Sequence, residues 1–142
     1  MAIRAIGTLL KIGDGATPTE TFTTIGEVTD LSGPGLSLDT IEVTHHSSTG
    51  GWKESIGGLL SGGEVSFTIN YTPTAATHNN TTGLIRDLRS RTVRNFQLVF
   101  PDAGSTTWAF AALVSSFEPS MPVDGQLSAD VTLTVTGQPT LV

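Results

Sequence analysis

Alternating apolar and polar residues predict a protein built mainly from β-strands. Residues 64–72 are the clearest case, because Val65, Phe67 and Ile69 share one face of an extended strand and polar residues occupy the other. Turns that contain glycine or proline separate the segments of this kind. We expect about seven strands, over residues 3–12, 21–28, 36–44, 64–72, 95–100, 106–117 and 127–136.

One α-helix is expected among these strands, over residues 81–91. Leu84, Ile85 and Leu88 form an apolar stripe with helical spacing, and Asp87 and Arg91 are placed to form an i,i+4 ion pair. The polar residues 80–82 are suitable caps for the start of this helix. A β-sandwich or partly open barrel with one flanking helix would bury the apolar faces of these elements.

The third expected strand, over residues 36–44, contains a change of phase. Its apolar residues switch from one face to the other between Leu38 and Ile41, which predicts a β-bulge near Asp39 or Thr40. The following segment, residues 45–63, contains three pairs of adjacent glycines and shows no clear period. We therefore expect a long, flexible, glycine-rich loop, and loops of this length usually carry a function.

Composition supports a single β-rich domain over residues 1–142. The length is typical of one domain, and threonine, a strand-favouring residue, occurs 23 times. The chain has no cysteine, which excludes disulfides and thiolate metal sites. The N-terminus lacks the features of a secretory signal, and no apolar run approaches the roughly 18 residues of a membrane-spanning helix. A soluble, unexported protein is expected.

Candidate residues for catalysis or metal binding do not form a recognisable site. His45 and His46 are adjacent, so on an extended strand they point to opposite faces and cannot share one ion. His78 is distant in the sequence, and we expect all three histidines to face solvent. No nucleophile motif, phosphate-binding glycine motif or nominated pair of carboxylates is present. We expect no enzyme activity and no cofactor.

The chain is acidic overall and has one basic segment. The net charge of −6 argues against affinity for nucleic acid or for anionic membranes. Four of the seven basic residues are Arg86, Arg89, Arg91 and Arg94. They could grip phosphates, lie on a solvated helix face or contact an acidic protein surface. Because no aromatic residue is interleaved to stack a base, we favour a contact with a neighbouring subunit.

Three segments together resemble the major tail tube proteins of long-tailed bacteriophages, especially the non-contractile group. They are residues 28–46 (VTDLSGPGLSLDTIEVTHH), residues 62–73 (GGEVSFTINYTP) and the closing residues 121–137, which begin MPVDGQL. Their order and spacing agree with the family from about residue 20 to residue 138. The resemblance implies a β-sandwich subunit with a flanking helix, six copies of which close a ring, and rings that stack into a tube.

The resemblance also implies where subunits meet. In tube proteins of this kind a long loop between early strands contacts neighbouring subunits, and the matching segment here is residues 45–63. The residues expected to make these contacts are His45, His46, Gly50, Gly51, Trp52, Lys53, Ile56, Leu59 and Leu60. Open sheet edges would join with those of neighbours to complete the wall of the tube.

The implied function is structural: the tube is the conduit for double-stranded DNA during genome delivery. The implied location is the virion tail, assembled in the cytoplasm of the host bacterium. Partners besides the protein itself would be tape-measure, tail-terminator and tail-tip or baseplate proteins. A conduit must not hold its cargo, so we expect a lumen of net negative potential and no specific DNA binding.

Two rival interpretations remain at this point. One is the inner tube of a contractile tail or of a type VI-like secretion apparatus, which shares the subunit design. The other belongs to a different class, a small monomeric β-sandwich module that binds carbohydrate or protein. Such a module needs an exposed aromatic cleft, whereas most aromatic residues here lie in phase on the apolar faces of the expected strands.

Overall fold

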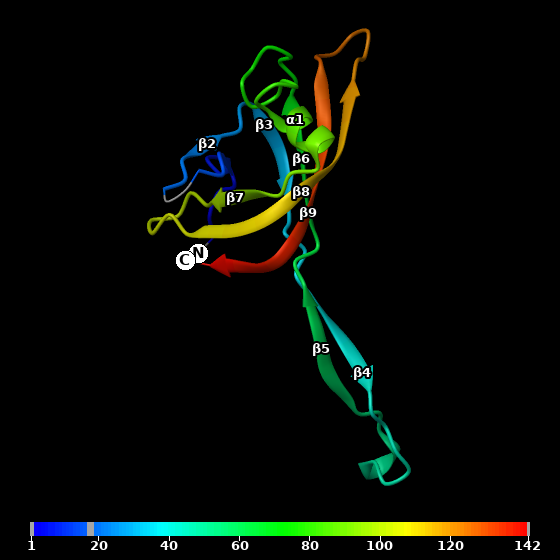
Figure 1. Cartoon of the computed structure of the whole chain (residues 1–142). Coiled ribbons are helices and arrows are strands. Elements are labelled where there is room, and N and C mark those ends of the chain that lie inside the picture. The colour runs from blue at the N-terminus through cyan, green and yellow to red at the C-terminus, as the bar shows by residue number, and fades with distance from the viewer. Residues whose placement is uncertain (1, 17–18, 142) are drawn as a thin grey trace.

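The computed structural model describes residues 2–16 and 19–141 and shows a protein made mainly of antiparallel β-strands (Figure 1). Nine strands in the described residues form one sheet of seven and one of two, which confirms the predicted fold class. The larger sheet has the strand order β2-β1-β7-β8-β9-β6-β3. Its strands are β1 (Leu9–Gly13), β2 (Phe22–Thr24), β3 (Val28–Ser32), β6 (Glu64–Asn70), β7 (Arg94–Val99), β8 (Thr107–Ser120) and β9 (Ser128–Leu141).

The larger sheet curls until its two edge strands approach each other. β2 and β3 stand at opposite ends of the strand order, yet only residues 25–27 connect them. A connection this short spans at most about 14 Å, so the two edges must lie close together and the sheet forms a partly open barrel. β8 and β9 have 14 residues each, and their pairing shifts register between Ala109 and Ala111 and between Val114 and Ser116. Irregularities of this kind bend strands, which helps the sheet to curl.

Apolar side chains from the predicted strand faces fill the interior. Val65, Phe67 and Ile69 are at most 3% exposed, as their alternation predicts. Phe96 and Phe110, on neighbouring strands, stack with ring centroids 5.9 Å apart. The buried core comprises Leu10, Ile25, Val65, Phe67, Ile69, Leu84, Phe96, Leu98, Phe110, Ala112, Val114, Ala129, Val131 and Leu133.

Two predicted strands are broken or much shortened in the structure, whereas β8 and β9 run past their predicted ends to Ser120 and Leu141. The segment predicted as one strand over residues 21–28 is broken at Glu27, where φ is +56°, so the chain turns from β2 into β3. Residues 3–8 are not in a strand, and only the end of the predicted segment 3–12 belongs to β1. A backbone in the left-handed region cannot continue a strand, and sequence alternation does not reveal it when the residue is not glycine.

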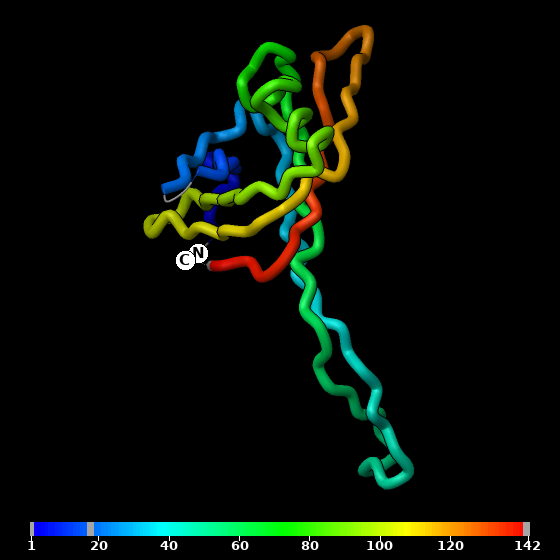
Figure 2. Tube along the Cα trace, viewed as in Figure 1, coloured from blue at the N-terminus to red at the C-terminus, as the bar shows by residue number. Residues whose placement is uncertain are grey.

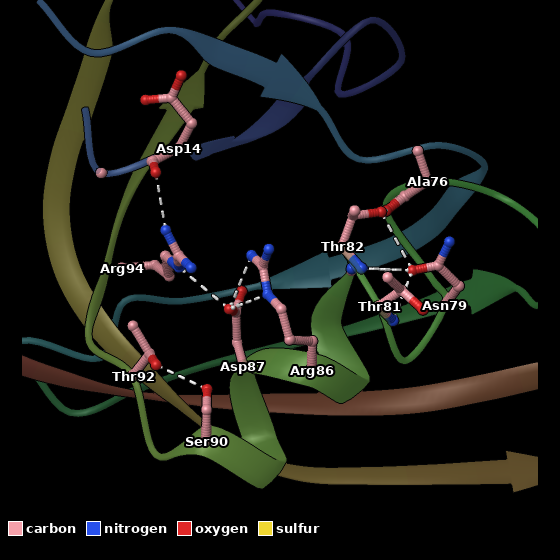
Figure 3. A network of polar contacts seen from close by, with 12 residues as sticks. Asp14, Ala76, Asn79, Thr81, Thr82, Arg86, Asp87, Ser90, Thr92 and Arg94 are labelled. Atoms are coloured by element: carbon pink, nitrogen blue, oxygen red, sulfur yellow. Dashed lines mark hydrogen bonds and ion pairs between the residues drawn. The ribbon is translucent and has the colours of Figure 1, made fainter.

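The helix α1 (Leu84–Ser90) is shorter than the predicted helix over residues 81–91 and packs against β8. The turn before it is organised by Asn79, whose side-chain oxygen accepts hydrogen bonds from the N–H groups of Thr81, Thr82 and Gly83 at 2.7–3.1 Å (Figure 3). Arg91 ends the helix with φ at +57°. The helix itself begins after Gly83 without a side-chain cap, so none of residues 80–82 caps it as predicted.

The two-stranded sheet forms an arm that extends away from the barrel (Figures 1 and 2). The arm (residues 36–62) consists of β4 (Ser37–Glu42), the short 3-10 helix η1 (Thr49–Gly51) and β5 (Ser55–Ser61). The prediction of a flexible loop over residues 45–63 is therefore wrong for β5, which pairs with β4 along its length. Only the tip of the arm lacks strand structure.

Close backbone packing fixes the root of the arm to the barrel. Gly63 has φ at +66°, and a Cβ atom there would lie 2.2 Å from the carbonyl oxygen of Gly35. The N–H of Val135 on β9 donates a hydrogen bond to the carbonyl oxygen of Gly63 at 3.0 Å. Any residue other than glycine at position 63 would push the two strands of the arm apart where they leave the barrel.

Candidate subunit-contact site

The arm exposes an unusual amount of apolar surface. Leu59 and Leu60 are each 81% exposed and Trp52 is 77% exposed, although they belong to residue types that proteins normally bury. Leu38, Ile41 and Ile56 are more than half exposed as well. Full burial of one such side chain is worth roughly 1.5–3 kcal/mol. Within its own chain the arm therefore leaves this apolar area in water.

Strand register places apolar side chains on both faces of the arm. Leu38 stands opposite Leu60, and Ile41 stands opposite Ile56. Because successive residues of a strand point to opposite faces, Leu38 and Ile41 lie on opposite faces of β4. Each cross-strand partner shares the face of the residue that it opposes. A surface that covers one pair therefore leaves the other pair in water, so the arm needs cover on both sides.

The predicted β-bulge is present, and the extra residue belongs to β5. From Leu38 to Thr40 the register partner changes from Leu60 to Gly57, so two residues of β5 stand opposite Asp39. β4 itself is regular. The change of phase seen in the sequence therefore reflects apolar residues on two faces of one straight strand, not a bulge within that strand.

The tip of the arm is organised by side chains around Glu54. Its carboxylate accepts a short hydrogen bond from the hydroxyl of Ser48 and lies 3.4 Å from Nε2 of His45. The N–H of Ser47 donates to Nδ1 of His45 at 3.1 Å. Just beyond the ends of β4 and β5, the N–H of Glu54 donates a hydrogen bond to the hydroxyl of Thr44 at 2.9 Å, and this hydroxyl donates to the carbonyl oxygen of Glu54 at 3.4 Å. The tip is therefore an ordered turn.

The predicted contact residues of the arm are brought together as one exposed projection. All of them are exposed: His45, His46, Gly50, Gly51, Trp52, Lys53, Ile56, Leu59 and Leu60. Gly50 and Gly51 have φ at +66° and +75°, and a Cβ atom at Gly50 would approach the indole of Trp52 at 3.0 Å. These glycines therefore set the turn that presents Trp52.

The four arginines of the basic segment do not form one surface. Asp87 is 1% exposed, and its Oδ1 accepts hydrogen bonds from Nε of Arg86 at 3.1 Å and Nε of Arg94 at 3.0 Å (Figure 3). Arg94 also donates to the carbonyl oxygen of Asp14 at 2.9 Å. Arg86 and Arg94 thus serve the fold. The predicted ion pair between Asp87 and Arg91 is wrong, because the left-handed backbone at Arg91 ends the helix there.

His78 was expected to face solvent, and this prediction is wrong. The side chain is fully buried beneath the chain that joins β2 to β3. Its two ring nitrogens contact the backbone of Gly26 and of Thr72. No local sequence signal distinguishes it from a surface histidine, because Gly26 is 52 residues away in the chain.

Two grooves were not foreseen from the sequence. One, of about 690 Å³, lies between residues 3–8 and β3. The other, of about 740 Å³, lies at the root of the arm between Leu36, Leu60 and Pro139. No group of three or more histidine, aspartate or glutamate residues in the described part of the chain is arranged to hold a metal ion. No helix among residues 2–16 and 19–141 is long and apolar enough to cross a membrane.

Solved structures with the same fold come from tail-like particles. A chain of the virion of the native gene transfer agent (GTA) particle has a TM-score of 0.80 at 21% sequence identity, with 99% of each chain covered. A chain of the tail of the empty GTA particle, determined with C6 symmetry, has a TM-score of 0.78 at 22% identity, again with 99% of each covered. A chain of the PVC extracellular contractile injection system, in its sheath/tube terminator structure, has a TM-score of 0.74 at 16% identity, with 100% of this chain and 97% of that chain covered.

Sequence comparison gives the family directly. No curated protein sequence matches this chain. The family model of the lambda phage tail tube protein, TTP, matches residues 13–142, which is nearly the whole chain. This match confirms the resemblance drawn from the three sequence segments, and the family is one of structural tail tube proteins and not of enzymes. The chain belongs to the lambda phage tail tube protein family and is a structural subunit of a virion tail.

Proposed function

We propose that six copies of this chain close a ring, that rings stack into the tail tube, and that the arm joins each copy to its neighbours. The observation that carries this proposal is the arm, an ordered projection whose apolar side chains on both faces are left in water by its own chain. The family membership supports self-association, because a tube is built from copies of its subunit. The C6 symmetry of the GTA tail, whose chain shares this fold, supports the number six.

The wall of the ring would be completed through the edges of the larger sheet. β2 and β3 each pair with one strand only among the described residues, so each leaves one row of backbone groups open. Open edges invite pairing with another chain. In a ring every such edge finds a partner, and no free edge remains around the circumference.

The tube would carry double-stranded DNA without binding it. A net charge of −6 for each copy gives the wall a negative potential unless the charges are strongly segregated. A negative lumen repels the phosphate backbone, whereas a basic one would retain DNA by counterion release. Tape-measure, tail-terminator and tail-tip or baseplate proteins are the partners expected inside and at the two ends of such a tube.

Assembly of the purified protein tests this function. Negative-stain electron microscopy of the concentrated wild-type protein should show rings or hollow stacks. The variant Leu59→Asp/Leu60→Asp should remain folded, because both side chains are 81% exposed, and should stay monomeric. The matched variant Leu59→Met/Leu60→Met keeps the apolar surface and should assemble. A wild-type protein that stays monomeric even with tail-initiating components added would refute the proposal.

A contractile system is the second candidate for the particle. The chain shares its fold with chains from the PVC injection system and, at a TM-score of 0.68, from the anti-feeding prophage baseplate. The same subunit design therefore serves tubes that have a sheath. Electron microscopy of the native particle separates the two, since a layer around the tube would assign it to a contractile tail.

A further inference from the structure

The turn at the end of the β8–β9 hairpin projects away from the barrel (Figure 1). All residues from 121 to 127 are exposed, Met121 to 72% and Val123 completely. Met121, Val123 and Leu127 are not among the apolar side chains that pack against the core. A turn without packing partners samples many backbone conformations, and it tolerates chemical change better than the core does.

This turn contains one of the two Asp-Gly pairs of the chain, Asp124-Gly125, and the other is Asp14-Gly15. In such a pair the backbone nitrogen of the glycine can attack the carboxyl carbon of the aspartate and close a five-membered succinimide ring. Attack within one molecule is far faster than the same reaction between two molecules, provided that the two atoms can meet. Glycine has no Cβ to crowd the nitrogen, and it permits the backbone angles that bring the nitrogen to the carboxyl group.

The two reacting groups of the turn are not held by the protein. Among the hydrogen bonds of residues 2–16 and 19–141, none uses the N–H of Gly125 or the carboxylate of Asp124. The neighbouring Gln126 donates to the side chain of Asn70 at 2.8 Å, so the bond that anchors the turn bypasses both groups. A Cβ atom at Gly125 would lie 2.7 Å from Cγ of Pro122. The shape of the turn therefore requires the glycine that makes the pair reactive.

Asp14-Gly15 shows the opposite arrangement. The N–H of Gly15 donates to Oε2 of Glu20 at 2.8 Å, so the attacking nitrogen is engaged. Oδ1 of Asp14 accepts from the N–H groups of Ala16 and Thr21 at 2.9 and 3.2 Å. These bonds, that from Ala16 first, hold the pKa of Asp14 below its ordinary 3.8. The carboxyl group therefore stays ionised, whereas succinimide formation consumes its un-ionised form.

We propose that Asp124-Gly125 is a site of spontaneous modification, at which aspartate is converted to isoaspartate through a succinimide. The nitrogen of Gly125 forms a bond to the carboxyl carbon of Asp124, and the carboxyl hydroxyl leaves with the amide proton as water. Water then adds to one of the two ring carbonyls. Addition at the former main-chain carbonyl breaks its bond to nitrogen, so the main chain now runs through Cβ of residue 124 and the α-carboxylate becomes the side group. No atom is gained or lost overall, and water is the only reactant.

The product changes the turn and leaves the rest of the subunit as it is. Isoaspartate adds one carbon to the backbone and keeps the net charge, and nothing packs on the turn, so we expect the fold and the stability of the barrel to be unchanged. Subunits of a virion tail are not resynthesised after the tail has formed, so the isomer accumulates as the particle ages. Its free α-carboxylate is the group that S-adenosylmethionine-dependent isoaspartyl methyltransferases esterify, so enzymes of this class should recognise aged protein.

Ageing of the purified wild-type protein tests the site. After incubation for weeks at neutral pH, peptide mapping should find isoaspartate at residue 124 and roughly tenfold less at residue 14, because the hydrogen bonds of Asp14 and Gly15 must open before attack. Endoproteinase Asp-N locates the isomer, since it cuts before aspartate and not before isoaspartate. In heavy-oxygen water the isomer should carry heavy oxygen, as hydrolysis of a succinimide requires. Urea denaturation of the aged protein should match that of fresh protein.

Two variants sharpen the test. Asp124→Glu keeps the charge but would have to close a six-membered ring, so residue 124 should stay unmodified. Glu20→Ala releases the N–H of Gly15 and should speed the reaction at Asp14 several-fold. An unmodified Asp124 in the aged wild-type protein, or equal conversion at both pairs, would overturn the proposal, and so would a Glu20→Ala variant whose Asp14 reacts no faster. The protein is kept dilute and unassembled throughout, so the result is independent of whether it forms tubes.

Discussion

Nε2 of His78 donates a hydrogen bond to the carbonyl oxygen of Gly26 at 2.8 Å, across 52 residues of sequence. The direction of this bond follows from the other ring nitrogen. The N–H of Thr72 donates to Nδ1 at 3.2 Å, so Nδ1 is unprotonated and the proton of the neutral ring is on Nε2. One buried side chain thereby joins the connection between β2 and β3 to the chain that follows β6.

Replacing His78 should destabilise the subunit without removing any surface used in assembly. His78→Leu leaves the half-buried carbonyl of Gly26 and the half-buried N–H of Thr72 without protein partners, which should lower the free energy of unfolding by roughly 1–3 kcal/mol. Urea denaturation followed by tryptophan fluorescence or circular dichroism measures this loss. His78→Gln can restore one of the two hydrogen bonds and should show a smaller loss. Equal stability of wild type and His78→Leu would show that the two bonds contribute nothing.

The ion network around Asp87 should be needed for folding, unlike the exposed arginines. Asp87→Ala leaves Arg94, whose side chain is 16% exposed, without its carboxylate, and this should cost roughly 3–5 kcal/mol. Arg89→Ala removes an exposed charge and should change the free energy of unfolding by less than about 1 kcal/mol. Urea denaturation of both variants checks this contrast. If Arg89→Ala destabilised as much as Asp87→Ala, Arg89 would belong to the fold and not to an assembly surface.

The core strands could be predicted because their signal is local. Alternation in residues 64–72 identified Val65, Phe67 and Ile69, and each is buried by residues of the same barrel. The arm could not be predicted in the same way. Gly57 and Gly58 carry no side chain to show which face they occupy, and the extra residue of β5 brings Leu59 and Leu60 out of a simple alternation. The apolar residues of the arm are also not packed in the core of their own chain, so their spacing does not indicate which face of the arm is buried.

Partners distant in sequence account for the other errors. Helical spacing predicts an ion pair between Asp87 and Arg91. Asp87 instead pairs with Arg94 on β7, which comes close to it only because the chain turns back after the helix. The sequence around His78 is typical of a surface segment, and only the fold brings Gly26 beside it. Among the four arginines, spacing could not separate the two that serve the fold from Arg89 and Arg91, because that distinction depends on three-dimensional contacts.

Both faces of the arm should be required for assembly. Leu38→Asn/Leu60→Asn removes apolar area from one face and Ile41→Asn/Ile56→Asn from the other, since each pair stands opposite across the strands. Loss of apolar burial should raise the concentration at which tubes form, by roughly tenfold or more for each variant. Light scattering against protein concentration measures this threshold. A variant that assembles like wild type would show that its face remains in water in the tube.

Acid should weaken the subunit in part through the turn between β7 and β8. The hydroxyl of Thr106 and then its N–H donate to the carboxylate of Asp102, at 2.5 and 2.7 Å, and these bonds lower the pKa of Asp102 from its ordinary 3.8. A carboxyl whose pKa is lower in the folded state stabilises the fold above the unfolded pKa, and this contribution is lost as the pH falls through the folded pKa. The loss should therefore occur below about pH 4.

Asp102→Asn removes this titration and keeps an oxygen that can accept from Thr106. Thermal unfolding midpoints measured from about pH 6 down to about pH 2 should fall less steeply for this variant than for the wild-type protein below about pH 4. At neutral pH the variant should be the less stable of the two, because the charged carboxylate makes the stronger hydrogen bonds. Asp124→Asn is the matched control, because it also removes one carboxylate but lies at the exposed turn between β8 and β9. Parallel acid profiles for wild type and Asp102→Asn would show that the bonds from Thr106 do not couple this carboxyl to folding.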